Sequence, residues 1–398
     1  MNSPNAINAR LLIFTVLALA LAGCRSHDFP QYPLNYREYA YVTNGGSGTV
    51  SVYDVVNVRL DREITVGQNP VAVAASPTRN EVYVVNFGTA AGQGSVTVIN
   101  AETNTVTATI AVRREPVAIE IDPTGELAYV ANSGSNTVSV LDLKARRTIT
   151  ELPTGEEPAA VRIAPDGKTL IVANRKAGSV SIFDLGTTPT TPSQRQSFDG
   201  CPGASDAVIL PDSSKAFVAC STGHQIMVLR LARPETHSAG APAVSAQPDR
   251  FEALLDVGQT PLQLALKPDG GELFAINSLS NSISEAVTGT NDVGGSYMIG
   301  DDPVRGLVSA DNAMLYVANL HSQYVTVYSI DDGRRAGSIH VGDGPTALGL
   351  SNSGLLLFVV DTRSEDVAVV RTASRSLFTL LPASRAPNAI ALKAFKLP

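Results

Sequence analysis

The sequence predicts an all-β protein with the architecture of an eight-bladed β-propeller. A short strand-forming phrase recurs eight times, and a proline recurs in step with it. After residue 24 the apolar residues alternate, as at Val50 and Val52, instead of following a helical period. A period near 42 residues with strand formers in each copy is typical of propeller blades. Seven blades are the alternative, if one degenerate unit has another structure.

The repeated phrase has the form aromatic-Val-x-Asn in four of its eight copies, and each of the other four departs from it at one position. Its copies start 42, 46, 42, 46, 57, 42 and 42 residues apart, at Tyr41, Tyr83, Tyr129, Ile171, Phe217, Phe274, Tyr316 and Phe358. The accompanying prolines are Pro70, Pro116, Pro158, Pro202, Pro261, Pro303, Pro345 and Pro387.

Each unit contains four predicted strands, which we name A to D. Strand A follows the proline, as in 71–74, and a tight turn leads to strand B, which is the phrase itself. Strand C (as in 137–140) and strand D (as in 107–110) complete an antiparallel blade. In this order the D–A and B–C loops share one face of the ring, and the A–B and C–D loops share the other.

The two ends of the repeat region are complementary. The first unit has strands B, C and D, whereas the segment Pro387 to Ala394 is a strand A with no strand B after it. We expect this last strand to become the innermost strand of the first blade, because closure leaves no open seam.

Two insertions interrupt C–D connections, at 185–195 and 230–250. Both are rich in Pro, Ala, Ser and Thr, a composition that cannot bury a core, and we expect mobile loops there.

The N-terminal 23 residues are typical of an export signal. Arg10 precedes an uncharged run that is too short to span a bilayer. The run ends in Leu-Ala-Gly before Cys24, which resembles the lipobox of bacterial lipoproteins and implies lipid attachment at Cys24. An ordinary secretory signal cleaved after Ala22 is the alternative. Residues 24–38 are then a tether, and residues 39–398 form the propeller. By the same resemblance to lipoproteins, Arg25 after the Cys favours the outer membrane over retention in the inner membrane.

The charge of the chain is acidic. The net charge is −7, and −8 once residues 1–23 with Arg10 are removed. This balance argues against nucleic acid as a partner. We expect a monomer that contacts the membrane through its lipid and a protein or glycan partner in the envelope.

The phrase Tyr-Val-Thr-Asn at 41–44, the A-turn-B pattern and the Val-x-Val strands resemble the YVTN family of β-propeller repeats. The resemblance covers residues 39–394. It implies the propeller fold, but not one chemistry, because related propellers include lactonases and haem- or quinone-dependent dehydrogenases.

Cys201 and Cys220 occupy the slot beside the proline and the Asn slot of one repeat. Both slots end the same hairpin, and an exported protein meets oxidising conditions, so we predict a disulfide between them. Two separate buried thiols are the alternative, because this repeat has a two-residue insertion.

The repeated Asn and the histidines carry no chemistry in this interpretation. An Asn at the end of each strand B is expected to bond its loop backbone. The five histidines have no metal-ligand spacing, and the motifs for phosphate, dinucleotide and covalent haem binding are missing. We therefore expect neither a metal nor a cofactor, and we assign no catalytic residue.

The D–A loops are the best place in the sequence for a ligand. They carry six acidic residues near the expected channel mouth, which are the candidate ligand or cation site: Glu115, Glu156, Glu157, Asp301, Asp302 and Asp343.

Every repeated feature thus has a structural explanation, and no catalytic set stands out. The sequence favours a lipid-anchored, non-catalytic binding or assembly scaffold for a protein, glycan or small ligand. The alternative is an enzyme, either a lactonase-like hydrolase or a cofactor-dependent oxidoreductase accessory, which uses the acidic channel mouth.

Overall fold

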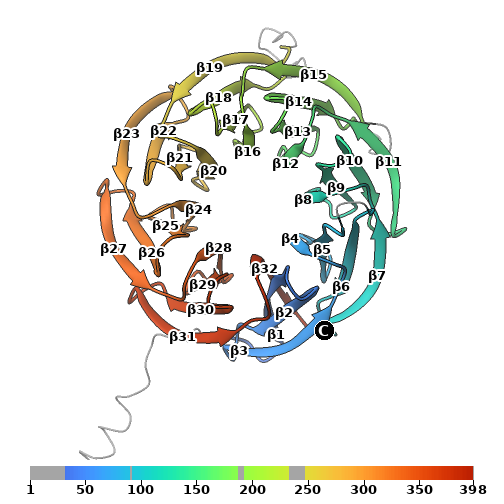
Figure 1. Cartoon of the computed structure of the whole chain (residues 1–398), viewed down its shortest axis with the longest axis vertical. Coiled ribbons are helices and arrows are strands. Elements are labelled where there is room, and N and C mark those ends of the chain that lie inside the picture. The colour runs from blue at the N-terminus through green and yellow to red at the C-terminus, as the bar shows by residue number, and fades with distance from the viewer. Residues whose placement is uncertain (1–31, 90–91, 187–191, 233–246, 398) are drawn as a thin grey trace, which may run out of the picture. The chain divides into compact units, whose positions relative to one another are not determined.

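The computed structural model describes residues 32–89, 92–186, 192–232 and 247–397. The unit Asn35–Pro398 forms a ring of eight four-stranded antiparallel sheets, which confirms the eight-bladed propeller (Figure 1). The predicted signal peptide, Cys24 and the first residues of the predicted tether lie outside the described residues. In the described part of the chain, no helix has the length and apolarity needed to cross a bilayer.

Blades 1 to 4 take their strands in the order A to D. Blade 1 consists of β32 (Pro387–Lys396), β1 (Tyr36–Asn44), β2 (Thr49–Asp54) and β3 (Arg59–Thr65). Blade 2 consists of β4 (Pro70–Ala75), β5 (Glu81–Asn86), β6 (Ser95–Asn100) and β7 (Thr105–Ala111). Blade 3 consists of β8 (Pro116–Ile121), β9 (Leu127–Asn132), β10 (Thr137–Asp142) and β11 (Arg147–Pro153). Blade 4 consists of β12 (Pro158–Ile163), β13 (Thr169–Asn174), β14 (Ser179–Asp184) and β15 (Ser193–Asp199).

Blades 5 to 8 follow the same order. Blade 5 consists of β16 (Ala204–Ile209), β17 (Lys215–Cys220), β18 (Gln225–Arg230) and β19 (Arg250–Asp256). Blade 6 consists of β20 (Pro261–Leu266), β21 (Glu272–Asn277), β22 (Ser282–Val287) and β23 (Asp292–Met298). Blade 7 consists of β24 (Pro303–Val308), β25 (Met314–Asn319), β26 (Tyr324–Ser329) and β27 (Arg334–His340). Blade 8 consists of β28 (Pro345–Leu350), β29 (Leu356–Asp361), β30 (Asp366–Arg371) and β31 (Ser376–Pro382).

The last strand closes the ring. β32 pairs with β1 in antiparallel register, from Tyr36 opposite Lys396 to Asn44 opposite Pro387. The strands A of all eight blades face the centre, and the strands D form the outer wall (Figure 1). Closure removes the edge that an open array would expose, and it joins the two ends of the propeller by backbone hydrogen bonds.

In six blades an Asn at the end of strand B ties strand B to strand C. In blade 3, for example, Asn132 Nδ2 donates to Thr137 Oγ1 at 3.2 Å and to Ser139 Oγ at 2.9 Å. The six Asn of this set are buried. The sequence predicted bonds to the loop backbone, and one is present in blade 2, where Asn86 Oδ1 accepts from Gly67 N at 3.0 Å. The bonds to hydroxyl groups of the neighbouring strand were not predicted.

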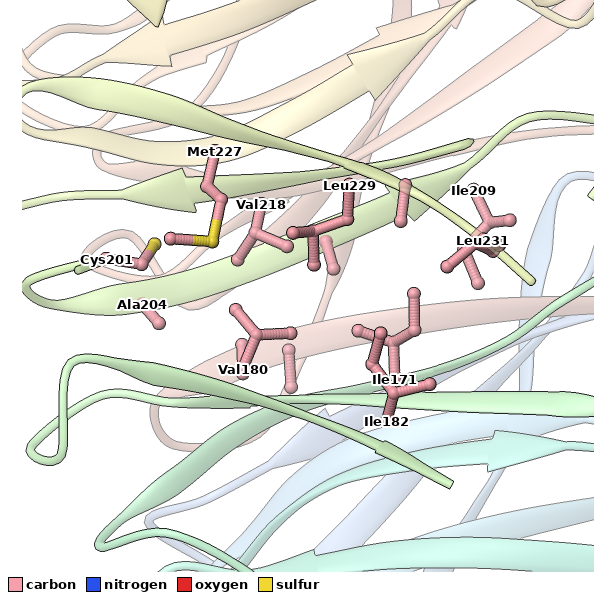
Figure 2. Packing of buried hydrophobic residues seen from close by; sticks show 14 of the residues in the cluster. Ile171, Val180, Ile182, Cys201, Ala204, Ile209, Val218, Met227, Leu229 and Leu231 are labelled. Atoms are coloured by element: carbon pink, nitrogen blue, oxygen red, sulfur yellow. The ribbon is translucent and has the colours of Figure 1, made fainter. Parts of the chain in front are cut away.

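The core lies between adjacent blades. The apolar faces of blades 4 and 5, for example, pack through Ile171, Val180 and Ile182 against Val218 and Leu229 (Figure 2). Strands B and C supply most of the fully buried side chains because they lie in the middle of each sheet. Burial of this kind is the main favourable term in folding.

The two insertions connect strands C and D, in blades 4 and 5. Residues 187–191 and 233–246 lie outside the described residues. The mobility expected for these two segments therefore stays a prediction. The ends of the insertions are joined by an ion pair between Arg195 and the fully buried side chain of Asp249. Asp249 Oδ1 also accepts a hydrogen bond from Ala232 N at 2.8 Å.

Candidate functional site

The acidic residues of the D–A loops occupy a slot that the repeat imposes. Glu115, Glu157 and Asp302 immediately precede the proline of strand A, and their φ angles are 54°, 53° and 52°. Thr260 and Ala386 hold the same slot with φ of 57° and 51°. A left-handed residue before proline is disfavoured, so the slot is held by the blade architecture whether or not the residue is acidic.

The acidic side chains find separate partners around the mouth of the channel. The ion pairs and hydrogen bonds are Glu156 with Lys176 at 3.0 Å, Asp302 with His321 at 3.0 Å, Asp343 with Arg363 at 3.8 Å and Asp301 with Asn281 at 3.5 Å. Among the residues that the structure describes, no three His, Cys, Asp or Glu side chains gather closely enough to hold a metal ion.

The predicted disulfide between Cys201 and Cys220 is present, with the two Cα atoms 4.7 Å apart. The register differs in detail from the sequence alignment, because Ala204 and not Pro202 lies opposite Cys220. The two inserted residues form a turn, in which Ala204 N donates to Cys201 O at 3.1 Å. This turn returns Cys201 to the strand end, where the disulfide takes the place of the Asn tie.

A cavity of about 530 Å³ lies in the central channel. Its wall is formed mainly by the strands A, which contribute small and apolar side chains such as Ala72, Ala118, Ala160, Ala347 and Ala389. These five alanines share one register position, opposite the third residue of the strand B phrase. An inner ring of alanines is the symmetric background of the channel.

Five polar residues break this background in five consecutive blades. At the alanine position stand Asp206, Gln263 and Arg305, in blades 5, 6 and 7. Two residues further along strand A stand Glu120 and Arg162, in blades 3 and 4. We call these five residues the polar arc. An active site needs one asymmetric set of groups, and the polar arc is such a set.

Arg162 and Asp206 form the centre of the polar arc. Arg162 Nη2 donates to Asp206 Oδ1 at 2.7 Å, and Arg162 Nε donates to Ala207 O at 3.0 Å. Asp206 Oδ2 accepts from Leu264 N at 3.1 Å, across the next blade boundary. Glu120 lies 3.9 Å from Arg162 Nη1. The arc thus links blades 3 to 6 by charged groups.

Gln263 and Arg305 extend the arc to blade 7. Gln263 Oε1 accepts from Gly306 N at 2.7 Å, which orients the amide. The guanidinium of Arg305 has no hydrogen bond or ion pair with any described residue. The residue is exposed to the channel. Desolvation by the surrounding protein lowers the pKa of Arg305, Asp206 acts in the opposite direction, and Arg162 lowers it further. Arg305 is therefore a cation available to a ligand.

The two carboxylates of the arc have different environments. Burial raises the pKa of Glu120, and Asp206 raises it further, while Arg162 opposes both effects. Asp206 is held by a guanidinium and a backbone amide. A carboxylate with a raised pKa can exchange a proton, and the cationic groups beside it can stabilise developing negative charge. Ester hydrolysis requires both.

The sequence contained a signal for the arc that we did not use. At the alanine position of strand A and two residues further along it, the other repeats carry small or apolar residues, and the departures are Glu120, Arg162, Asp206, Gln263 and Arg305. An alignment of the strands A at these two positions distinguishes the five residues, whereas the loop charges do not point to them.

Comparison with known proteins gives a partial match to an enzyme family. The model described as "Lactonase, 7-bladed beta-propeller" matches residues 38–154, a stretch that contains nearly all of β1 to β3 and all of blades 2 and 3. Glu120 lies within it. No curated protein matches the sequence.

Several solved structures share the fold at low sequence identity. The periplasmic gluconolactonase PpgL of Pseudomonas aeruginosa has a TM-score of 0.58 and 16% identity, over 91% of this chain and 99% of that one. A putative 6-phosphogluconolactonase of Bacteroides fragilis has a TM-score of 0.58 and 14% identity, over 92% and 99%. The dihydro-heme d1 dehydrogenase NirN, in complex with DHE, has a TM-score of 0.68 and 15% identity, over 91% and 76%.

These findings correct the functional hypothesis drawn from the sequence. A non-catalytic scaffold was favoured because no catalytic set stood out, but the family match points to an enzyme. The physical reason for the error is that the polar arc is spread over five strands far apart in the chain. Over its first three blades, the chain is similar to lactonases.

Proposed function

We propose that this protein is a lactonase, which hydrolyses the ester bond of a cyclic ester in the central channel. The observation that carries the proposal is the polar arc, an asymmetric set of which Arg162, Asp206, Gln263 and Arg305 line the channel cavity and Glu120 lies 3.9 Å from Arg162. The partial match to a lactonase family model supports it. The finer relation to YVTN repeat proteins rests on the eight repeated phrases.

Glu120 is the proposed general base. It accepts a proton from a water molecule as that water attacks the lactone carbonyl carbon, and the ring C–O bond breaks as the intermediate collapses. The proton passes from Glu120 to the leaving alkoxide, which gives the hydroxy acid. Burial favours this role because a raised pKa brings the carboxylate closer to the operating pH.

Arg305 is the proposed electrophilic group. A guanidinium without a protein partner, enclosed by the channel, stabilises the negative charge that develops on the carbonyl oxygen, or binds an anionic group of the substrate. Arg162 is held in place by Asp206 and by Ala207 O. We assign Arg162 and Asp206 to positioning and to the electrostatics of Glu120.

The decisive experiment is a lactone hydrolysis assay with the purified protein. Glucono-δ-lactone and its 6-phosphate are suitable substrates, because the pair tests whether Arg305 binds a substrate anion. We expect hydrolysis above the spontaneous rate, with large losses in E120Q and R305M. The exposed variants E102Q and R334M are matched controls that should keep full activity. Wild-type rates equal to the spontaneous rate for both lactones, or full activity in E120Q, would overturn the proposal.

We also propose that the protein is exported and anchored through a lipid on Cys24, with the outer membrane as its destination. The lipobox-like residues before Cys24 and the Arg at position 25 support this. Labelling of growing cells with a fatty acid should mark the wild-type protein and not C24A. Labelling of both, or of neither, would contradict the assignment, and fractionation would identify the membrane.

A further inference from the structure

Blade 8 departs from the tie that joins strands B and C in other blades. In the six blades that have an Asn there, its amide donates to hydroxyl groups of strand C, as Asn174 does to Ser179 and Ser181. In blade 8 the Asn is replaced by Asp361 and the first hydroxyl residue by Asp366. Two carboxyl groups therefore occupy the place of an amide and a hydroxyl.

The two carboxyl groups face one another in a protected position. Asp361 lies directly opposite Asp366 in the register of β29 and β30, and Asp361 is 0% exposed. Asp361 Oδ2 accepts from Gly342 N at 3.0 Å. The Oδ1 atoms of both residues have no donor among the described residues, and the two side chains lie within hydrogen-bonding reach of each other. Two ionised carboxylates in this arrangement would repel strongly.

We propose that Asp361 and Asp366 share one proton and form a pH-sensitive latch that holds the D–A loop at Gly342 against blade 8. With the proton in place, one carboxyl donates to the other and imitates the Asn-to-Ser tie of the other blades. When the proton leaves, the carboxylates repel and the Gly342 loop is released. This device is independent of the proposed lactonase chemistry.

The titration has the direction that a latch requires. Burial, together with Asp366, raises the pKa of Asp361 to about 8, and burial also raises the pKa of Asp366. A proton bound more tightly in the folded state stabilises it most at low pH. That stabilisation is lost as pH rises from the ordinary range of a carboxyl toward about 8.

The charged groups around the pair do not neutralise a second carboxylate charge in place of the shared proton. From the adjacent loops, Asp343 pairs with Arg363 at 3.8 Å, and Glu365 is exposed. From blade 1, Tyr53 feels the charge of Asp366 but donates its hydroxyl to Pro382 O. Within the described residues, neither carboxylate forms an ion pair with Lys, Arg or His.

The latch is connected to the channel wall. The loop at Gly342 leads into β28, whose Ala347 and Leu348 line the cavity. On the other side, Thr362 follows Asp361 and donates to Pro387 O of the closing strand, and its hydroxyl lies 2.6 Å from that of Thr346. Release of the latch would therefore loosen the wall where blade 8 meets blade 1.

The test compares thermal unfolding of the full chain and two variants between pH 5 and pH 9. D361N restores the residue of the other blades and keeps an acceptor for Gly342 N. The difference between the unfolding midpoints of D361N and wild type should increase with pH. At pH 9 D361N should be the more stable protein. The exposed variant E365Q should follow wild type at every pH. D366S, which restores the hydroxyl, removes the repulsion but keeps the buried Asp361, so its difference from wild type should change with pH in the same direction as that of D361N and by less.

Amide exchange of Gly342 gives an independent readout. In wild type, above the pKa of the pair, the equilibrium constant for opening of the loop should increase by about tenfold for each pH unit. This increase is measured after correction for the intrinsic pH dependence of amide exchange. D361N should not show it. A difference in unfolding midpoint between D361N and wild type that does not change with pH, or a Gly342 amide equally protected in both proteins, would overturn the proposal.

Discussion

Arg162 and Asp206 lie on the inner strands of neighbouring blades, and Arg162 Nη2 donates to Asp206 Oδ1 at 2.7 Å. Asp206 raises the pKa of Arg162 against the effect of burial. Asp206 also accepts from the backbone of the following blade. One carboxylate thus joins three blades at the channel wall and orients the guanidinium beside Glu120.

Removal of Asp206 should destabilise the protein and impair the channel. D206A leaves Arg162 enclosed without its anion and Leu264 N without its acceptor, and we expect a loss of about 2–4 kcal/mol in the free energy of unfolding. Urea denaturation measures it. D332N removes an exposed partner of Arg334 and should change the stability by less than about 0.5 kcal/mol. Similar losses in both variants would contradict the structural role of Asp206.

Glu120 should lower the stability of the folded protein while it supports lactone hydrolysis. Because its pKa is raised in the folded state, the ionised form costs stability, and this cost grows as pH rises from the ordinary range of a Glu through the raised pKa. E120Q should therefore be more stable than wild type at neutral pH, while lactone hydrolysis falls by about 10²- to 10⁴-fold. Denaturation and kcat/KM at several pH values check both parts. The acidic limb of the wild-type profile should lie above pH 4.5 and be lost in E120Q.

The disulfide should contribute to stability through the unfolded chain. Cys201 and Cys220 are 19 residues apart, and closing a loop of that length contributes about 3 kcal/mol. The double variant C201S/C220S should lose about that amount in oxidising buffer. Wild type should lose a comparable amount once a reductant has opened the bond under denaturing conditions. Equal unfolding midpoints for the oxidised protein and the double variant would show that the bond is not formed in solution.

The closing strand should be required for a soluble ring. Deletion of residues 387–398 removes β32 and exposes the edge of β1, so we expect an aggregated or partly unfolded product. Light scattering and circular dichroism measure this outcome. A peptide of residues 387–397 added in trans should pair with the free edge and restore solubility, whereas a scrambled peptide should not. A monomeric, cooperatively folding truncated chain would show that closure is dispensable.

In the blades that have an Asn tie, its hydrogen bonds should contribute measurably to the free energy of unfolding. Asn277 is fully buried and donates to Ser282 at 3.3 Å and to Ser284 at 2.9 Å. N277A removes two hydrogen bonds of about 0.5–1.5 kcal/mol each and should cost about 1–3 kcal/mol in urea denaturation. N352A changes an exposed side chain in a turn and serves as the control. Equal stability of N277A and wild type would reduce the repeated Asn to a packing residue.

The strand phrase, the prolines and the cysteine spacing allowed much of the fold to be predicted. The proline opposite the Asn of each strand B, as Pro70 is opposite Asn86, follows from a spacing of 16 residues that six repeats share. Closure by residues 387–394 followed from counting strands. Local alternation and turn chemistry are written in consecutive residues, so these features can be predicted before any contact is known.

The sequence by itself determined the repeat and the strand order, and it favoured eight blades and a disulfide between Cys201 and Cys220 over seven blades and two separate thiols. Only the tertiary structure decided which side chains meet at the channel wall. Arg162, Asp206, Gln263 and Arg305 line the cavity from four blades, Glu120 approaches Arg162 from a fifth, and they come together once the ring is closed. The tertiary structure also separated the loop acids, which looked adjacent in the repeat but point to different partners. Strand pairing depends on local pattern, whereas convergence of side chains depends on the curvature and closure of the whole array.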